Sequence, residues 1–271
     1  MRKAFITVGL AIAAVVFLLP VFITFTSSFM GLTELTQLYE QHSVWMRLIP
    51  MKVTLNGYYE LLFASGSYLS MFWNSMLVAT AISVGNVFVA LLVGYVLAKV
   101  PFRGRDSLRF MYIAMMMMPF QVTLLPNYII VKQLGLYNTI WALILPGMFA
   151  PFGVFLLSQF LRGISDEMVE AAVLETNSPI QILVQVVAPM VYPGLLALFL
   201  LSFSEAWNMV EQPLILLQDS WRYPLSLVLN NVQGANLAVA FAGSVLYMLP
   251  VVLLYRMFEE ELFQGLSVAK F

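Results

Sequence analysis

The sequence predicts an all-α, polytopic membrane protein with six transmembrane helices. Hydrophobic residues make up 61% of its 271 residues and charged residues only 10%, whereas a soluble globular protein carries about 25% charged residues. The charges also leave six uncharged runs, and each run is long enough for a membrane-spanning helix of about 20 residues. These runs are 4–33, 61–98, 110–131, 133–161, 176–204 and 223–255.

The rest of the composition excludes several other classes of protein. The runs are continuous, whereas the strands of an outer-membrane barrel alternate in polarity over about ten residues. The chain has no cysteine, which excludes disulfides, thiolate metal sites and cysteine catalysis. A net charge of −1 leaves no basic surface for nucleic acid. The only histidine is His42, and no metal site can be assembled around it.

Each predicted span follows from one of the uncharged runs. The first run follows Arg2 and Lys3 and continues to about Phe29, which is longer than the apolar core of a secretory signal. It also lacks a clear small-x-small cleavage site, so we expect a retained span in contact with the lipid bilayer. The six spans of a single transmembrane domain, residues 1–271, are then expected at about 5–27, 72–97, 110–130, 140–160, 188–208 and 237–255.

Prolines interrupt three of these spans. Pro20 lies in the first, Pro119 and Pro126 in the third, and Pro146 and Pro151 in the fourth. A proline frees a backbone carbonyl and kinks a helix, and membrane proteins tolerate this where a neighbour or a cavity satisfies the backbone. The third and fourth spans therefore either line a pathway or bend only to pack against their neighbours.

The distribution of Lys and Arg predicts the orientation. With these spans, nine Lys and Arg residues lie on the side of both termini and four on the other side. Four of the nine lie in the short 98–109 loop. Because short cytoplasmic loops are enriched in Lys and Arg, we expect both termini in the cytoplasm.

The predicted cytoplasmic loop 161–187 differs from the other loops because it is acidic and helical. Asp166, Glu167 and Glu170 fall in the first turns of a predicted helix, where the helix dipole favours negative charge. Ser178 and Pro179 then form a second start signal, a serine cap followed by proline at the first helical position. An acidic face on a cytoplasmic loop indicates a docking surface for another protein.

The same loop resembles the cytoplasmic motif of binding-protein-dependent ABC importer permeases. That motif is Glu-Ala-Ala, three residues, Gly, nine residues and Ile-x-Leu-Pro. All of its spacings are kept here, on Glu170, Ala171, Ala172, Thr176, Val186, Ala188 and Pro189. Further stretches resemble the carbohydrate-uptake branch, and especially the smaller permease subunit of maltose importers: 54–58, 74–75, 118–122, 134–139, 207–208, 212–214 and 265–267.

The motif departs from the family pattern at three positions. Val186 and Ala188 replace isoleucine and leucine, and Thr176 replaces the glycine. Glycine after a helix usually supplies a left-handed backbone, which a β-branched threonine resists and which Asn177 tolerates better. Either the turn slips by one residue or the docking loop is weakened.

The resemblance implies a type I importer permease fold and a transport subunit rather than an enzyme. Its partners would be a second permease, giving a heterodimer, two cytoplasmic ATPase subunits and an extracytoplasmic solute-binding protein, in a prokaryotic inner membrane. ATP and Mg²⁺ would be bound by the ATPase subunits, and this chain has no G-x-x-x-x-G-K-[ST] phosphate loop. The helix 166–176 would be the coupling helix, the external loop 209–236 would reach toward the binding protein, and the tail 257–271 would insert between the ATPase subunits.

Three groups of residues are the resulting candidates for function. The ATPase-coupling group is Glu167, Glu170, Ala171, Ala172, Thr176, Asn177 and Pro189. The binding-protein group is Ser220, Trp221 and Arg222. The substrate-path group is Asn74, Gln121, Glu205, Trp207 and Asn208. Within it, Glu205 is an ionisable residue near the outer end of a span, which suits substrate contact, subunit contact or simple solvation.

Two other functions remain as alternatives. An ion-coupled secondary transporter of a small polar solute would need more membrane-buried charges, and it leaves the acidic loop helix unexplained. A membrane-embedded enzyme is less favoured, because the chain has no cysteine and no cluster of catalytic acids. The sequence does not identify the transported sugar or sugar-related solute.

Overall fold

The computed structural model describes residues 2–40, 49–64, 66–176, 178–230 and 237–260. These residues form helices and connecting loops, and they contain no β-strand. The chain divides into two compact units. One comprises the residues up to Phe72 together with Val228–Pro250, and the other comprises Trp73–Leu227 together with the residues from Val251 onward. Asn177 and the end of the tail, including 265–267, lie outside the described residues.

The first unit holds the N-terminal span. Helix α1, Arg2–Ser27, continues through Pro20 without a break, and none of its most apolar window is buried in the protein. Short helices follow it: α2 (Leu32–Glu40), α3 (Asn56–Tyr59) and the π-helix η1 (Glu60–Ala64). Most of α15, Leu237–Met257, belongs here too. Gly57 lies directly against α15, because a Cβ at this position would be 2.4 Å from the Ala238 carbonyl oxygen.

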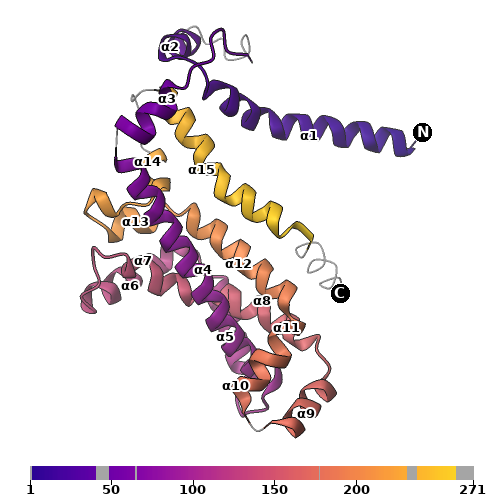
Figure 1. Ribbon diagram of the computed structural model, residues 1–271. Helices are drawn as coiled ribbons and strands as arrows, with labels where there is room; N and C mark the ends of the chain where they lie inside the picture. Colours follow the sequence, from indigo (N-terminus) through magenta and orange to yellow (C-terminus); the bar gives the residue numbers. More distant parts are fainter. Residues whose placement is uncertain (1, 41–48, 65, 177, 231–236, 261–271) are drawn as a thin grey trace. The chain divides into compact units, whose positions relative to one another are not determined.

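The second unit begins within α4, Ser67–Lys99, and contains most of the other helices. They are α5 (Arg105–Met116), α6 (Phe120–Gln133), α7 (Trp141–Met148), α8 (Pro151–Arg162), α9 (Asp166–Glu175), α10 (Pro179–Ile182), η2 (Leu183–Val187), α11 (Ala188–Met190), α12 (Tyr192–Trp207), α13 (Glu211–Leu216) and η3 (Ser220–Arg222). Helix α14, Leu225–Asn230, follows at the boundary. In this unit α9 and α10 lie at one end, and α6 and α13 at the other (Figure 1).

Four stretches of the described residues can each cross a membrane, and bent pairs of helices bring the number to as many as six. The four are Phe5–Ser27, Ser67–Lys99, Trp141–Arg162 and Leu237–Met257. They coincide closely with the first, second, fourth and sixth predicted spans.

The third and fifth predicted spans are not straight helices. Around 110–130, α5 and α6 meet at a bend of 102°, and Pro119 stands at the start of α6. Around 188–208, the helix ending at Met190 meets α12 at a bend of 83°, and Pro193 lies in the first turn of α12. A proline lacks the N–H that would continue the preceding helix, and it restricts the residue before it. The bend in the third span agrees with the interruption expected from its prolines, whereas the bend in the fifth span was not predicted.

A buried amide stabilises the break between α7 and α8. Asn86 of α4 is only 1% exposed, and its Nδ2 donates to the carbonyls of Met148 and Ala150 at 3.2 and 3.4 Å. The Ser202 hydroxyl of α12 donates to Asn86 Oδ1 at 3.2 Å. Carbonyls freed by a helix break in a membrane need such partners, since lipid offers none. Asn86 therefore joins three segments at the point where the fourth span is interrupted.

Candidate functional site

Helix α9 forms where the acidic loop helix was predicted. Ser165 precedes it with an extended backbone, and Asp166 and Glu167 occupy its first turn, where the helix dipole favours negative charge. The helix ends at Glu175, and the following residue, Thr176, is also extended, with φ of −148° and ψ of 140°. Thr176 therefore does not adopt the left-handed conformation that glycine would supply at this position.

The start signal after α9 is confirmed. The Ser178 hydroxyl accepts a hydrogen bond from the Gln181 backbone N–H at 3.4 Å, and Pro179 is the first residue of α10. The Thr176 hydroxyl bonds to the side-chain oxygen of Gln181 at 2.9 Å. Threonine thus makes a polar contact across the turn. Pro189 lies farther along, exposed in α11 just before the 83° bend.

Helix α9 has a buried face and an exposed face. Ala172 is buried, and Val169 packs against the same core cluster as Leu161 and Ile164. The neighbouring apolar side chains Met168 and Val173 remain about half exposed, so the buried face of α9 is narrow. The opposite face carries Glu167, Glu170, Ala171 and Leu174, all exposed.

Lys99 joins α9 to the end of α4. Its Nζ lies 2.6 Å from Asp166 Oδ1 and also donates to the Ile164 carbonyl. The Lys99 side chain is only 5% exposed, whereas that of Asp166 is 82% exposed. The hydrogen bond and charge of Lys99 hold the pKa of the Asp166 carboxyl below its usual range, and Arg105 makes a smaller contribution. The start of α9 is therefore fixed to a transmembrane helix.

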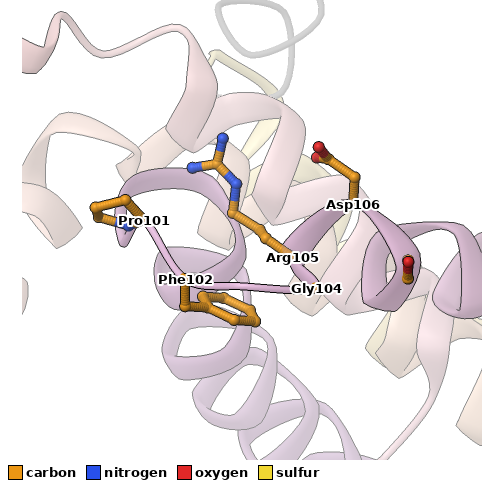
Figure 2. Close-up of a pocket in the computed structure, with 6 residues that line it drawn as sticks. Pro101, Phe102, Gly104, Arg105 and Asp106 are labelled. Atoms are coloured by element: carbon orange, nitrogen blue, oxygen red, sulfur yellow. The ribbon is translucent and has the colours of Figure 1, made fainter.

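The turn between α4 and α5 lies beside this contact and encloses a hollow of about 360 Å³ (Figure 2). Pro101 and Phe102 line it from the extended stretch, and Arg105 and Asp106 from the start of α5. Arg109 donates to Asp106 at 2.8 Å and to the Leu97 carbonyl. Because the last carbonyls of a helix lack partners within it, Arg109 both caps α4 and holds α5 against it.

The other end of the second unit carries the predicted binding-protein group. Trp221 is 64% exposed, and the Arg222 guanidinium lies 4.5 Å from the centre of its ring. Ser220, also exposed, begins the same short helix η3. Asn74 Nδ2 donates to the Trp221 carbonyl at 2.7 Å. Asn74 therefore holds this loop, which places it with the binding-protein group.

A second asparagine holds the same loop, and sequence reasoning did not single it out. Asn138 bonds to residues 216, 218 and 219 through its backbone and its side chain. The stretch 134–139 was noted only for its family resemblance. An Asn that follows an apolar helix and a Gly is a turn signal, and this signal could have drawn attention to it.

The remaining substrate-path residues have separate environments. Gln121 is exposed in the first turn of α6, and Glu205 is exposed on α12. Asn208 ends α12, where its Nδ2 donates to the Ser204 carbonyl at 2.7 Å. Trp207 is only 1% exposed and stacks on Phe203, with ring centres 5.7 Å apart. Its ring belongs to the packed interior, which corrects its place in the substrate-path group.

Nothing in the described part of the chain suggests a metal centre, since no three His, Asp or Glu residues gather there. The two ends of the second unit carry the two exposed candidate surfaces. One is an acidic helix that contacts α4 through Lys99, and the other is an aromatic and cationic loop that contacts α4 through Asn74.

The fold is that of the permease chains of ABC importers. It matches a chain in the crystal structure of a bacterial ABC transporter involved in the import of the acidic polysaccharide alginate, with a TM-score of 0.82. The match covers 96% of this chain and 95% of the other, at 22% sequence identity. The predicted all-α type I fold is confirmed.

The chain belongs to the family of binding-protein-dependent transport system inner membrane components, whose model matches residues 90–264. It is 29% identical to the arabinooligosaccharides transport system permease protein AraQ of Halalkalibacterium halodurans, over 97% of this chain and 94% of that protein. The inner membrane ABC transporter permease protein YcjP of Escherichia coli is 28% identical over 96% and 92%. The sn-glycerol-3-phosphate transport system permease protein UgpE of Brucella abortus is 27% identical over 78% and 75%.

Family and fold together define a multi-pass inner-membrane permease of an ABC importer. It is a transport subunit and not an enzyme, and its family implies a complex with another permease, an ATPase and a binding protein. The family and the fold give no support to the alternative of an ion-coupled secondary transporter.

Proposed function

We propose that this permease conducts a carbohydrate or a sugar-derived solute. The proposal is supported by relatives that are named for arabinooligosaccharides and for sn-glycerol-3-phosphate. Among the predicted path residues, Gln121, Glu205 and Asn208 keep exposed polar side chains that suit sugar hydroxyls. A panel of sugars and sugar phosphates, tested by calorimetry against the partner binding protein, would identify the solute.

The permease works in a complex of five chains: this subunit, a second and different permease, two cytoplasmic ATPase subunits and an external binding protein. The ATPase subunits bind ATP and Mg²⁺, and their closure drives the permeases between inward-facing and outward-facing states. Uptake into vesicles should therefore require ATP inside and binding protein outside. Uptake that followed an ion gradient and ignored ATP would contradict the proposal.

The exposed face of α9 is the observation that carries the coupling role. Glu167, Glu170, Ala171 and Leu174 follow the spacing i, i+3, i+4, i+7, which places them on one side of a helix. The two carboxylates offer charge to a basic partner, and the small Ala171 lets a second backbone approach. Leu174 is 90% exposed, and a large apolar side chain in that position favours burial in a partner.

The tie between Lys99 and Asp166 supplies the mechanical step. A closing ATPase displaces α9, and the contact of Lys99 with Asp166 and the Ile164 carbonyl passes this displacement to α4. The buried Ala172 and the partly buried Val169 pass it to the core that α9 shares with α8 and α12. The coupling helix and the spans thus move as connected parts.

Replacement of Glu170 tests the coupling role. Truncating one partner of a buried charged contact between subunits costs about 2–5 kcal/mol, and about 1.4 kcal/mol is a tenfold change in affinity. Glu170→Ala should weaken binding of the ATPase subunits at least tenfold, or leave ATP hydrolysis uncoupled from uptake. Glu175→Ala, at the other end of α9, is the matched control and should do much less. Unchanged affinity, hydrolysis and uptake in Glu170→Ala would contradict the role.

At the opposite end, the Trp221–Arg222 pair meets the solute-loaded binding protein. Its support is the exposure of Trp221 and the fixed stacking of Arg222 on its ring. The double variant Trp221→Ala/Arg222→Ala should raise the concentration of binding protein needed for half-maximal uptake, with the assembled complex intact. Unchanged uptake at every concentration of binding protein would remove this pair from the surface.

A further inference from the structure

Asn138 has an unusual backbone conformation in the loop after α6. Among the residues that the structure describes, it is the only non-glycine residue with a positive φ, at 60°. Asparagine visits this left-handed region more readily than other side chains, because its short polar group can bond locally. A positive φ is still unfavourable in free energy for a non-glycine residue. The contacts of Asn138 therefore show what stabilises this conformation.

These contacts engage every hydrogen-bonding group of the side chain. Its Oδ1 accepts from the backbone N–H groups of Gln218 at 2.8 Å and Asp219 at 3.1 Å. Its Nδ2 donates to Asp219 Oδ2 at 3.0 Å. The Asn138 backbone N–H donates to the Leu216 carbonyl at 2.9 Å. One residue therefore fixes both the backbone and the carboxylate of the segment before η3.

Asp219 continues the chain of contacts to the exposed pair. Its Oδ2, which accepts from Asn138, lies 3.6 Å from Arg222 Nη1. Arg222 in turn stacks on Trp221, whose carbonyl is held by Asn74. The orientation of Asp219 thus connects Asn138 to the Trp221–Arg222 pair.

We propose that Asn138 is a positioning residue that, through Asp219, presents the Trp221–Arg222 pair to the solute-loaded binding protein. This inference rests on the proposed function of that pair. Asn138 does not itself contact the binding protein. Its effect is therefore on the concentration of binding protein that the transporter needs, and it leaves the maximal rate of transport unchanged.

Reversal of the hydrogen-bond partners tests the inference. Asn138→Asp keeps the size of the side chain and its acceptor for the two N–H groups, but it turns a carboxylate toward Asp219. The complex with its ATPase subunits and second permease is placed in lipid nanodiscs, and ATP hydrolysis is measured against the concentration of solute-loaded binding protein. The half-saturating concentration should rise at least fivefold, and the maximal rate should change less than twofold.

The double variant Asn138→Asp/Asp219→Asn restores one donor and one acceptor with their roles exchanged. The single variant Asp219→Asn is the control for the charge lost beside Arg222. The half-saturating concentration of the double variant should return to within twofold of the value for this control. Asn138→Gly is a second variant, because glycine adopts positive φ freely but lacks the side-chain bonds. It should raise the half-saturating concentration without adding a charge.

The outcomes separate the inference from the function on which it rests. If Trp221→Ala/Arg222→Ala raises the half-saturating concentration but Asn138→Asp and Asn138→Gly do not, the positioning role is overturned and the binding-protein surface stands. If none of the three variants changes it, both are overturned. If the double variant fails to recover, or the Asn138 variants lower only the yield of assembled complex, Asn138 has a purely structural role and the inference is also overturned.

Discussion

Lys99 combines a nearly buried ammonium group with two acceptors that belong to the start of one neighbouring helix. Lys99→Met keeps the unbranched shape of the side chain and most of its length but removes the charge and the donors. The Asp166 carboxylate and the Ile164 carbonyl then lose this partner, and α9 is held only by its apolar face. We expect the number of ATP molecules hydrolysed per solute molecule taken up to rise at least threefold.

The measurement is the ratio of ATP hydrolysis to uptake in reconstituted vesicles. Asp166→Asn is the milder counterpart, because its amide oxygen still accepts a hydrogen bond at an exposed position. It should raise the ratio less than Lys99→Met does. An unchanged ratio in Lys99→Met, with full assembly, would show that α9 is coupled to the spans by its apolar face alone.

The pKa of Asp166 determines how this tie depends on pH. Its pKa is lowered in the folded protein, so its stabilising effect is complete above the ordinary Asp value of about 3.9 and is lost as the pH falls through the lower folded value. Between pH 6 and 8 the tie is therefore constant. Any change in coupling over that interval must come from another group.

The environments of individual side chains were the part of the site that the sequence could predict least. From the sequence alone, a tryptophan at the end of a span could contact a sugar ring or pack in the core. In the structure Trp207 stacks on Phe203, so it belongs to the core. Asn74 could be predicted as polar and near the surface, but not as a donor to a carbonyl 147 residues away. Motif spacing and helix start signals located α9 because a helix depends on local sequence, whereas the conformation of Asn138 depends on contacts distant in sequence.

At the scale of the elements, composition predicted where spans lie but not how each proline acts. Pro20, Pro126, Pro146 and Pro250 lie inside helices. Pro119, Pro151 and Pro193 instead stand at or near helix starts. A freed carbonyl is tolerated only where a neighbour supplies a donor, and such donors come from other segments. This is why a kink in the third span could be expected from its prolines, whereas the bend of the fifth span and the angle of either bend could not.

Asn86 provides the test at this scale, because it supplies donors to the break between α7 and α8. Asn86→Leu has a similar volume but leaves the carbonyls of Met148 and Ala150 without this partner. A buried polar group left unsatisfied costs about 1–3 kcal/mol, so the purified complex should unfold at a temperature several degrees lower. Thermal unfolding in detergent, followed by tryptophan fluorescence, gives the measurement.

Ser202→Ala is the control, because it removes one donor to Asn86 and leaves both carbonyls satisfied. It should lower the unfolding temperature by less than half as much. If Asn86→Leu were as stable as the unchanged protein, the backbone at the break would have to find its partners elsewhere.

For the whole molecule, the excess of Lys and Arg on one side predicts that the α4–α5 turn is cytoplasmic and η3 external. The chain has no cysteine, so single cysteines can be introduced without further changes. Ser107 and Ser220 are both exposed and lie on opposite predicted sides. In intact cells, a membrane-impermeant maleimide should label Ser220→Cys and should label Ser107→Cys only after the membrane is opened. The reverse pattern would invert the orientation.

One further consequence follows from the length of α4. Asn74 and Lys99 are 25 residues apart on a continuous helix, which corresponds to about seven turns and about 37 Å. The two side chains thus project from nearly the same face, one toward η3 and one toward α9. Inserting a single residue between them would rotate one contact by about 100° relative to the other, so both could not form. Inserting seven would realign the faces but separate them by about 10 Å more. The contacts of Asn74 with Trp221 and of Lys99 with Asp166 therefore constrain the number of residues between them in α4, and not only the hydrophobicity of the helix.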